Sequence, residues 1–270
     1  MIITFIGGGN MAAALIGGLL QQGTARGDIR VVEISAEARA RLERDYAVAT
    51  FAGAAKAAPG SDVIVLAVKP QQMRAVAQAL APVLGQALVI TIAAGIRTAD
   101  LARWLGGARR IVRAMPNTPA LVRAGAAGLY ATPGTDAADR ERAAALLGAV
   151  GETVWLERED LLDAVTAVSG SGPAYVFYFI EALEAAGCEL GLTAAQARAL
   201  ALETFLGASK LAHASNDEPA VLRERVTSRG GTTERAIAGL EQDRVKAAIV
   251  RAVRAAAERS RELGDQLGAD

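Results

Sequence analysis

The amino-acid sequence predicts an α/β domain followed by an all-α domain. Three observations support this prediction: a glycine turn directly after a first apolar strand, an alternation of apolar strands with helices, and the lack of any strand pattern in the second half of the chain. Such an alternation is typical of a mostly parallel sheet with helices on both faces. We expect the boundary to divide residues 1–157 from residues 158–270.

The first strand and its turn are the most informative stretch of the first domain. Met1–Ile6 is an apolar run rich in isoleucine, and Gly7-Gly8-Gly9-Asn10-Met11-Ala12 then reads G-x-G-x-x-A before a helix. Glycines let the backbone approach a pyrophosphate, and a helix N-terminus offers free N–H groups. This context indicates an N-terminal Rossmann-like dinucleotide-binding domain. The alternative is a glycine turn that only closes an ordinary βα unit.

The remaining elements of this domain follow in order along the chain. We expect strands at Asp28–Glu33, Ala47–Phe51, Asp62–Val68, Ala87–Ala93, Arg109–Met115, Ala126–Thr132 and Glu152–Leu156, and helices at Ala36–Asp45, Gln71–Leu84 and Asp136–Val150. Ligands of such sheets lie at the carboxyl ends of the strands. One crevice should therefore be lined by Gly7–Ala12, Glu33–Ser35, Val68–Pro70, Ala93–Gly95 and Met115–Pro119.

Glu33 ends the second expected strand, about twenty residues beyond the glycine turn, where a ribose-binding carboxylate belongs. A carboxylate there would accept a hydrogen bond from the 2′-OH of NAD(H) and repel the 2′-phosphate of NADP(H). Arg30, Ser35 and Arg39 are close enough in sequence to offset that repulsion, and a solvated glutamate is the alternative. The sequence leaves the choice of cofactor open.

The second half of the chain predicts helices alone. Ser171 should cap a long helix that reaches Leu190. Thr193–Gln196 reads as a capping box for a helix to about His213, and Ser215–Pro219 as the same device for a short helix to Arg225. The last expected helix spans residues 243–263. An apolar stripe on the first of these helices predicts a core or a subunit interface, and hence an obligate dimer; its residues are Tyr175, Tyr178, Phe179 and Leu183.

The loop Val226–Thr233 stands before an expected helix at Glu234–Leu240. It contains two glycines and four hydroxyl side chains. Backbone N–H groups and hydroxyls at a helix start are suited to bind an anion. A capped turn between helices is the alternative, but it would need only one hydroxyl. A substrate carboxylate would use the others.

At this loop the sequence resembles the Δ1-pyrroline-5-carboxylate reductase family. The matching residues are Pro219-Ala220-Val221-Leu222, Val226-Thr227-Ser228, Gly230-Gly231, Thr233, Ala236-Ile237 and Leu240-Glu241, and the likeness extends to Ala67–Pro70, Met115–Pro119 and Ser169–Tyr175. The resemblance implies a reductase that converts Δ1-pyrroline-5-carboxylate to L-proline with NAD(P)H, in the last step of proline synthesis. It also implies a C-terminal dimerisation domain whose helices interleave with those of a second subunit, in dimers that can assemble further into decamers.

The resemblance also implies which residues form the site. Thr233 is the expected catalytic residue, because its hydroxyl can hold the ring nitrogen and relay a proton. The expected substrate-binding residues are Glu159, Arg225, Ser228, Gly230, Gly231, Thr232 and Thr233. The expected cofactor-binding residues come from the glycine turn and the crevice loops: Ile6, Gly7, Gly9, Asn10, Met11, Glu33, Ser35, Ala67, Val68, Lys69, Pro70, Ala94, Gly95 and Asn117.

Three positions depart from the family pattern. Arg229 stands where the family usually has proline, which bears on the rigidity of the substrate loop. Ala54 stands where many members have an asparagine beside the ribose, which bears on cofactor preference. Arg225 replaces an amide found in some relatives, which bears on one substrate contact.

The supply of proton donors favours an imine substrate. Reduction of a ketone needs a strong donor, yet the chain has one histidine and four lysines, and no lysine follows Ser169–Pro173 as in β-hydroxyacid dehydrogenases. A cyclic imine protonated at nitrogen is already the electrophile. The alternatives are another imine or β-hydroxyacid reductase on the same scaffold, and a non-catalytic scaffold that senses a dinucleotide.

The composition argues against several other classes. A net charge of zero gives no reason to expect nucleic acid or an anionic membrane as a partner. No apolar run reaches membrane-spanning length, and Met1–Ile6 leads into the glycine turn without a signal-peptide layout. Cys188 stands alone, so we expect a reducing cytoplasm. With one histidine and one cysteine, no metal site of soft ligands is expected.

Overall fold

The computed structural model describes residues 1–269. These residues form two compact units, one of residues 1–171 together with 256–269, and the other of Gly172–Ala255. This division reflects which residues pack together, whereas the predicted boundary after residue 157 marks where the strand pattern ends. That boundary therefore stays a prediction about domain organisation. The last residue of the predicted second domain, Asp270, lies outside the described residues.

The first unit contains an eight-stranded sheet in the order β3-β2-β1-β4-β5-β6-β7-β8. Every neighbouring pair is parallel except β6 with β7, so the predicted mostly parallel sheet is confirmed. The strands β1, β4 and β5 are buried along their whole length, which explains their continuous apolar sequences. The strands span Ile3–Ile6 (β1), Ile29–Val32 (β2), Ala49–Phe51 (β3), Val63–Leu66 (β4), Leu88–Thr91 (β5), Ile111–Met115 (β6), Gly125–Ala131 (β7) and Gly151–Trp155 (β8).

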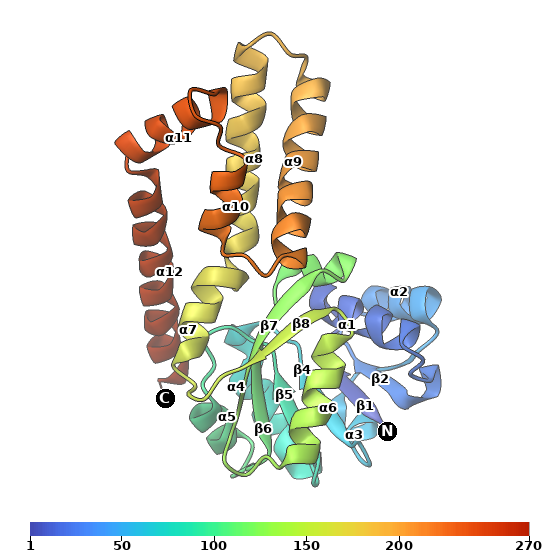
Figure 1. The fold of residues 1–270 in the computed structure, drawn as a ribbon. Helices are drawn as coiled ribbons and strands as arrows, with labels where there is room; N and C mark the ends of the chain where they lie inside the picture. The colour runs from blue at the N-terminus through green and yellow to red at the C-terminus, as the bar shows by residue number, and fades with distance from the viewer. Residues whose placement is uncertain (270) are drawn as a thin grey trace. The chain divides into compact units, whose positions relative to one another are not determined.

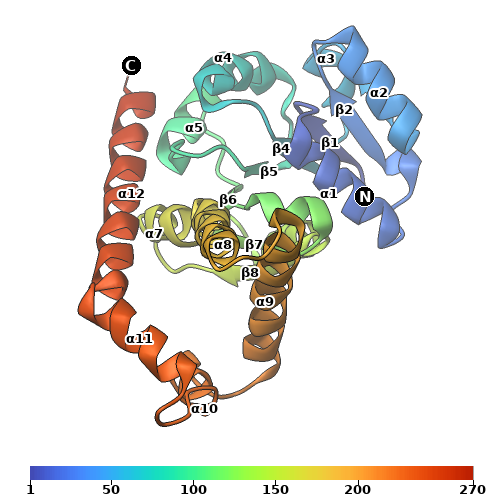
Figure 2. The same cartoon turned by 90° about the horizontal axis from the view of Figure 1, so that it is seen from above.

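Helices cover both faces of this sheet, each over its own apolar core. The helices α1 (Asn10–Gln21), α2 (Ala36–Tyr46) and α6 (Ala137–Gly148) contribute to one core, in which Phe5 and Leu15 are fully buried. The helices α3 (Ala54–Ala57), α4 (Pro70–Leu80) and α5 (Thr98–Trp104) contribute to the other, around Leu66 and Met73. Figure 2 shows α4 and α5 together on one side of the sheet.

Several short elements were not expected from the sequence. The helices α3 and α5 have four and seven residues, too short for a helical repeat of apolar residues to be recognised. Short 3₁₀ segments occupy Arg26–Asp28, Ala81–Val83 and Thr118–Val122. The helix expected over 71–84 gives way to the second of these segments after Leu80, because Pro82 has no N–H to continue an α-helical ladder.

The start of the long helix α8 (Gly172–Glu189) differs from the prediction. Ser171 was expected to cap it, but its backbone is helical, with φ −85° and ψ −18°, and its N–H donates to the Thr166 carbonyl at 2.8 Å. It ends a π-helical segment, Thr166–Gly170, which follows α7 (Leu161–Val165). Chain that is already helical before Ser171 leaves no N-terminus for that side chain to cap.

The second unit contains α8, α9 (Ala194–Ala214), α10 (Pro219–Arg225), α11 (Thr232–Gln242) and the first part of α12 (Val245–Gly268). Figure 1 shows α8 and α9 side by side as a hairpin. The small residue Gly187 makes this approach possible, since an added Cβ would lie 2.9 Å from that of Ala197.

The two predicted capping boxes had different outcomes. The box at Thr193 is confirmed: its Oγ1 accepts from the Gln196 N–H at 3.3 Å, and Gln196 accepts from the Thr193 N–H at 3.0 Å. The box at Ser215 is wrong. Its Oγ accepts from the Asp217 N–H at 3.0 Å in a local turn, and α10 begins at Pro219 without a side-chain cap.

Candidate functional site

The glycine turn between β1 and α1 packs tightly on its own domain. Gly7 has a φ of +102°, and a Cβ added to it would lie 2.6 Å from the Ala67 carbonyl oxygen. A Cβ at Gly8 would lie 2.5 Å from a methyl group of Leu42. The backbone contact and the positive φ require glycine at position 7, whereas a side chain at position 8 would have to displace Leu42.

Gly9 is free of such contacts. It is the N-cap of α1, and a Cβ added there would meet no atom within 4 Å. Within residues 1–269 no side chain caps this helix, so its first N–H groups have no side-chain acceptor. A bare helix start beside an uncovered glycine fits the pyrophosphate of a dinucleotide.

A hollow of about 670 Å³ lies next to this turn, at the carboxyl ends of β1 to β4. It brings together seven of the predicted cofactor-binding residues: Ile6, Gly7, Gly9, Glu33, Ala67, Val68 and Lys69. Asn10 and Met11 begin α1 beside it, Ser35 is the N-cap of α2, and Pro70 is the first residue of α4. Three residues from the loop after β3 also line the hollow: Ala52, Gly53 and Ala54. The resemblance placed Ala54 beside the ribose, whereas Ala52 and Gly53 were not predicted as site residues.

Glu33 lies against the glycine turn. Its Oε2 accepts from the Gly8 N–H at 3.0 Å, and its Oε1 accepts from the Ser35 N–H at 2.9 Å. Arg39 donates from Nη1 to the carbonyls of Glu33 and Ile34 at 2.7 and 3.0 Å, which fixes a positive charge on the same loop. The Ile34 side chain is 80% exposed beside this carboxylate. Glu33 and Ile34 therefore present a carboxylate and an apolar surface to the hollow, and the Arg39 cation is bound to the backbone of the same loop.

The other predicted cofactor residues, at the ends of β5 and β6, do not line this hollow. Gly95 is buried with a φ of +75°, and a Cβ there would lie 3.0 Å from Leu267. Asn117 uses its whole amide on the backbone: Nδ2 donates to the Ser169 carbonyl at 3.0 Å, and Oδ1 accepts from the Ala126 N–H at 2.9 Å. The Asn117 side chain therefore stabilises the loop after β6.

Glu159 follows β8 and has protein partners for both carboxylate oxygens. It accepts from the N–H and the hydroxyl of Thr98, each at 2.7 Å, and from Nη1 of Arg113 at 3.0 Å. Thr98 and Arg113 are both buried. These contacts tie the start of α5 to β6 within the first unit.

The hydroxyl-rich loop lies in the second unit, between α10 and α11. The helix α11 begins at Thr232 with Gly231 as its N-cap, two residues before the expected start. Thr233 is therefore the second residue of the helix and does not cap it. Gly230 adopts a φ of +72°, and its N–H donates to the Glu234 carboxylate at 2.7 Å.

The hydroxyls of this loop are mostly unused. Thr227 donates to the Arg223 carbonyl at 2.7 Å. In the part of the chain that the structure describes, no hydrogen bond involves the side chains of Ser228, Thr232 or Thr233. Only one of the four hydroxyls, that of Thr227, is therefore bonded within the turn, and a simple interhelical turn would need no more than one. The other three lie at the start of α11, where the first helix N–H groups lack intrahelical acceptors.

Arg225 ends α10 just before this loop. Its Nη1 donates to Asp217 Oδ2 at 2.5 Å, and its side chain is exposed. The pair keeps the guanidinium near the start of the loop while leaving its other N–H groups in solvent. A carboxylate could therefore reach this cation without displacing a buried contact.

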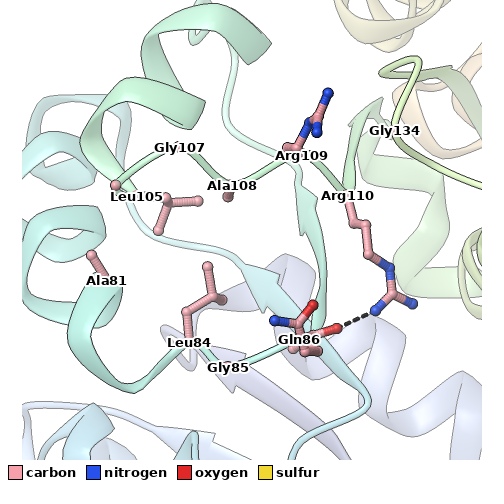
Figure 3. Close-up of a pocket in the computed structure, with 12 residues that line it drawn as sticks. Ala81, Leu84, Gly85, Gln86, Leu105, Gly107, Ala108, Arg109, Arg110 and Gly134 are labelled. Carbon is pink, nitrogen blue, oxygen red and sulfur yellow. Dashed lines mark hydrogen bonds between the residues drawn. The ribbon is translucent and has the colours of Figure 1, made fainter.

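A second hollow in the first unit, of about 540 Å³, lies at the amino ends of β5 and β6, the edge opposite to the glycine turn. Figure 3 shows the side chain of Arg109 directed away from it and a hydrogen bond from Arg110 to Gln86 at its edge. Arg110 donates to the Gln86 carbonyl and to both oxygens of buried Asp139, at 2.8 and 2.7 Å. This guanidinium holds the pKa of the Asp139 carboxyl below its ordinary value, and it is committed to that ion pair.

No helix within residues 1–269 is long and apolar enough to cross a membrane. No cluster of three or more histidine, cysteine, aspartate or glutamate residues in the same range is arranged to hold a metal ion.

Comparisons with known proteins agree with this arrangement of domains. Residues 159–263 match a family model described as pyrroline-5-carboxylate reductase dimerisation. Residues 2–95 match one described as NADP oxidoreductase, coenzyme F420-dependent. The predicted fold class, an α/β Rossmann-like domain followed by an all-α dimerisation domain, is thus confirmed.

Individual relatives match over nearly the full length. The pyrroline-5-carboxylate reductase of Pseudomonas aeruginosa is 51% identical over 267 residues, 98% of both chains. The structure of a pyrroline-5-carboxylate reductase from Coxiella burnetii superposes with a TM-score of 0.93 at 42% identity, covering 97% of both chains. A Plasmodium falciparum pyrroline carboxylate reductase with NADP bound has a TM-score of 0.86 at 29% identity, covering 98% of both. The chain belongs to the pyrroline-5-carboxylate reductase family.

Proposed function

We propose that this protein reduces the C=N bond of Δ1-pyrroline-5-carboxylate to give L-proline, with NAD(P)H as the reductant, and so performs the last step of proline biosynthesis. The observation that carries the proposal is the loop at the start of α11. Among residues 1–269, three of its hydroxyls have no hydrogen-bond partner and lie beside the uncapped helix start, in a chain that belongs to this family. The cytoplasm is the proposed compartment, since the exposed Cys188 has no second cysteine to pair with.

The first unit would bind the cofactor. The glycine turn and the N-terminus of α1 hold its pyrophosphate, and the end of β2 faces its ribose. When bound, the reduced nicotinamide supplies a hydride. The chain's own contribution is to orient the two ligands and to keep water away from them, which can account for a large part of the rate.

The loop in the second unit would bind the substrate. Ser228 and the N–H groups of α11 hold the substrate carboxylate, with Gly230, Gly231 and Thr232 shaping the loop. Thr233 holds the ring nitrogen. Arg225 supplies a further positive charge to the carboxylate. A cyclic imine protonated at nitrogen needs no strong acid, so a hydroxyl is sufficient in this position.

Self-association follows from the dimerisation segment that spans residues 159–263. We propose that the stable form is a dimer, from which a decamer could be built. The support is an apolar groove of about 300 Å³ within the second unit, lined by Tyr175, Tyr178 and Phe179 of α8 and by residues of α12. Tyr178 is 71% exposed in the single chain, and such an apolar surface favours burial by a second copy.

The dimer can be tested by sedimentation equilibrium of the wild type and of Tyr178→Asp. We expect a stable dimer, or a multiple of it, at micromolar concentration for the wild type. A charge at position 178 should shift the variant toward smaller species, because burial of an unpaired carboxylate is unfavourable. An active wild-type monomer at micromolar concentration would contradict the proposal.

The glycine turn can be tested with Gly9→Ala. Since no protein atom lies within 4 Å of the added methyl group, the variant should melt within a few degrees of the wild type. The methyl group would occupy the space of the pyrophosphate, so the Kd for NADH and NADPH should rise about tenfold or more. Gly148→Ala, which also adds a methyl group in open space but on α6, is the matched control and should bind normally.

Cofactor preference can be tested with Glu33→Ala. Loss of the carboxylate should move the ratio of kcat/KM for NADPH over NADH upward by about tenfold, because a charge that repels the 2′-phosphate is removed and Arg39 remains. Glu37→Ala, an exposed glutamate in the first turn of α2, should leave the ratio unchanged. An unchanged ratio in Glu33→Ala would mean that Glu33 serves only to hold the glycine turn.

The reaction itself can be tested with Thr233→Val and Ser228→Ala, assayed with Δ1-pyrroline-5-carboxylate and with an open-chain keto acid. The Thr233 hydroxyl contacts a nitrogen whose charge changes during reduction, so its loss should lower kcat by roughly 10²-fold. The Ser228 contact is made equally in ground and transition states, so its loss should mainly raise KM.

Two controls accompany this experiment. Because neither hydroxyl caps α11, thermal melts should stay close to that of the wild type. Wild-type kcat in Thr233→Val would remove Thr233 from the catalytic role. Reduction of the keto acid by the wild type in preference to the imine would overturn the proposed substrate.

A further inference from the structure

The loop Ile92–Arg97 connects β5 to α5 at the carboxyl edge of the sheet. It starts beside the end of β4, where the Ile92 N–H donates to the Leu66 carbonyl at 3.2 Å, and it turns sharply at Gly95, with a φ of +75°. The next loop along this edge is Ala67–Pro70, which lines the cofactor hollow. The loop Ile92–Arg97 does not line the hollow itself. Ligands of such sheets lie along the carboxyl ends of the strands, so a dinucleotide that extends beyond Ala67–Pro70 along this edge would next meet this loop.

The helix after this loop has no cap of its own. Arg97 occupies the N-cap position of α5 and makes no side-chain cap hydrogen bond. Glu159 supplies the missing acceptor from a part of the chain 61 residues away: its Oε1 accepts from the Thr98 N–H and its Oε2 from the Thr98 hydroxyl, each at 2.7 Å. A carboxylate at a helix N-terminus also favours the helix dipole.

A buried arginine fixes Glu159 in turn. Arg113 lies on β6 with its side chain only 7% exposed, and its Nη1 donates to Glu159 Oε1 at 3.0 Å. A buried guanidinium is costly without a carboxylate partner. Glu159 now uses three of its roughly four acceptor positions on the protein. Little capacity remains for a substrate, and the geometry of these contacts resists a change of direction.

The end of α12 holds the same loop from another direction. Leu267 lies against Gly95, and Arg97 donates to Asp265 at 2.6 Å. The loop is therefore held at Gly95 and Arg97 by α12 and at Thr98 by Glu159. Loss of the Glu159 contact alone should loosen the loop without unfolding it.

We propose that Glu159, oriented by Arg113, is a positioning residue for the cofactor: it caps α5 through Thr98 and thereby sets the loop Ile92–Arg97 against which the cofactor binds. This inference rests on the proposed function, because it takes the cofactor to extend from the glycine turn along the carboxyl edge of the sheet as far as this loop. In this role Glu159 affects the affinity for the cofactor, whereas a residue that contacted the substrate would affect the affinity for the substrate.

The test compares Thr98→Val and Glu159→Gln with Thr98→Ser. Valine removes the hydroxyl and keeps the N–H, glutamine removes the charge and keeps an acceptor oxygen, and serine keeps the hydroxyl. The measurements are the Kd of NADH and of NADPH without substrate, kcat and KM for Δ1-pyrroline-5-carboxylate, and thermal melts.

We expect Thr98→Val and Glu159→Gln to raise the Kd of both cofactors and to lower kcat, each about tenfold, the size of one lost hydrogen bond to a charged group. The KM for Δ1-pyrroline-5-carboxylate should stay within about twofold, and Thr98→Ser should match the wild type. The double variant should bind cofactor no more weakly than Glu159→Gln alone, because both changes break the same contact.

A raised KM for the substrate with an unchanged Kd for the cofactors would overturn the proposal and make Glu159 a substrate contact. Lower melting temperatures with unchanged Kd and kcat would also overturn it, since the network would then be structural only. Should Glu159→Gln fail to fold, Thr98→Val still decides the question. Failure of the wild type to reduce the imine would sink the proposed function, whereas the cofactor titrations would still test this inference.

Discussion

The alignment of the parallel strands is the constraint on which the rest of this structure depends. Ile6, the last residue of β1, pairs with Val32 of β2 on one side and with Leu66 of β4 on the other. Because these strands end in register, the glycine turn, Glu33 and Val68 all emerge at one edge. The tight packing of Gly7 against the Ala67 carbonyl is possible only because neighbouring strands end at the same level.

Backbone groups and hydroxyls dominate the proposed site. The cofactor would meet glycines and a bare helix start, and the substrate would meet a second bare helix start with three unpaired hydroxyls. Such groups orient ligands without supplying a strong acid or base. This limitation suits a cyclic imine, whose protonated form accepts hydride directly, and it suits a ketone poorly. The chemistry and the small number of histidine and lysine residues therefore agree.

Two partly buried ion pairs lie at opposite edges of the sheet and connect different elements. At the amino edge, Arg110 lines a hollow and holds Asp139 in an ion pair. At the carboxyl edge, Arg113 holds Glu159 against the start of α5. Each pair joins elements that are distant in sequence. The second lies at the carboxyl edge, where sheets of this kind bind their ligands, and it holds the start of α5 directly after the loop Ile92–Arg97.

The sequence by itself determined the features that depend on neighbouring residues. Buried strands read as apolar runs, the box at Thr193 reads as a helix start, Pro219 begins α10, and the glycine turn follows β1 as expected. The hydroxyl-rich loop was found in the same way, because its composition exceeds what a turn needs. These signals are local, since they arise from steric limits and hydrogen bonds within a few residues.

Only the tertiary structure decided the features that depend on distant residues. The cap of α5 comes from Glu159, so no residue near Thr98 in sequence predicts the start of that helix. The Asn117 side chain forms hydrogen bonds with the backbone of Ser169 and of Ala126. The loop after β3 lines the hollow because β3 lies beside β2 in the sheet. The start of α11 at Thr232 freed the Thr233 hydroxyl from a capping role. In each case the fold brings groups that are far apart in sequence within hydrogen-bonding or packing distance. The spacing of residues along the chain does not reveal such contacts.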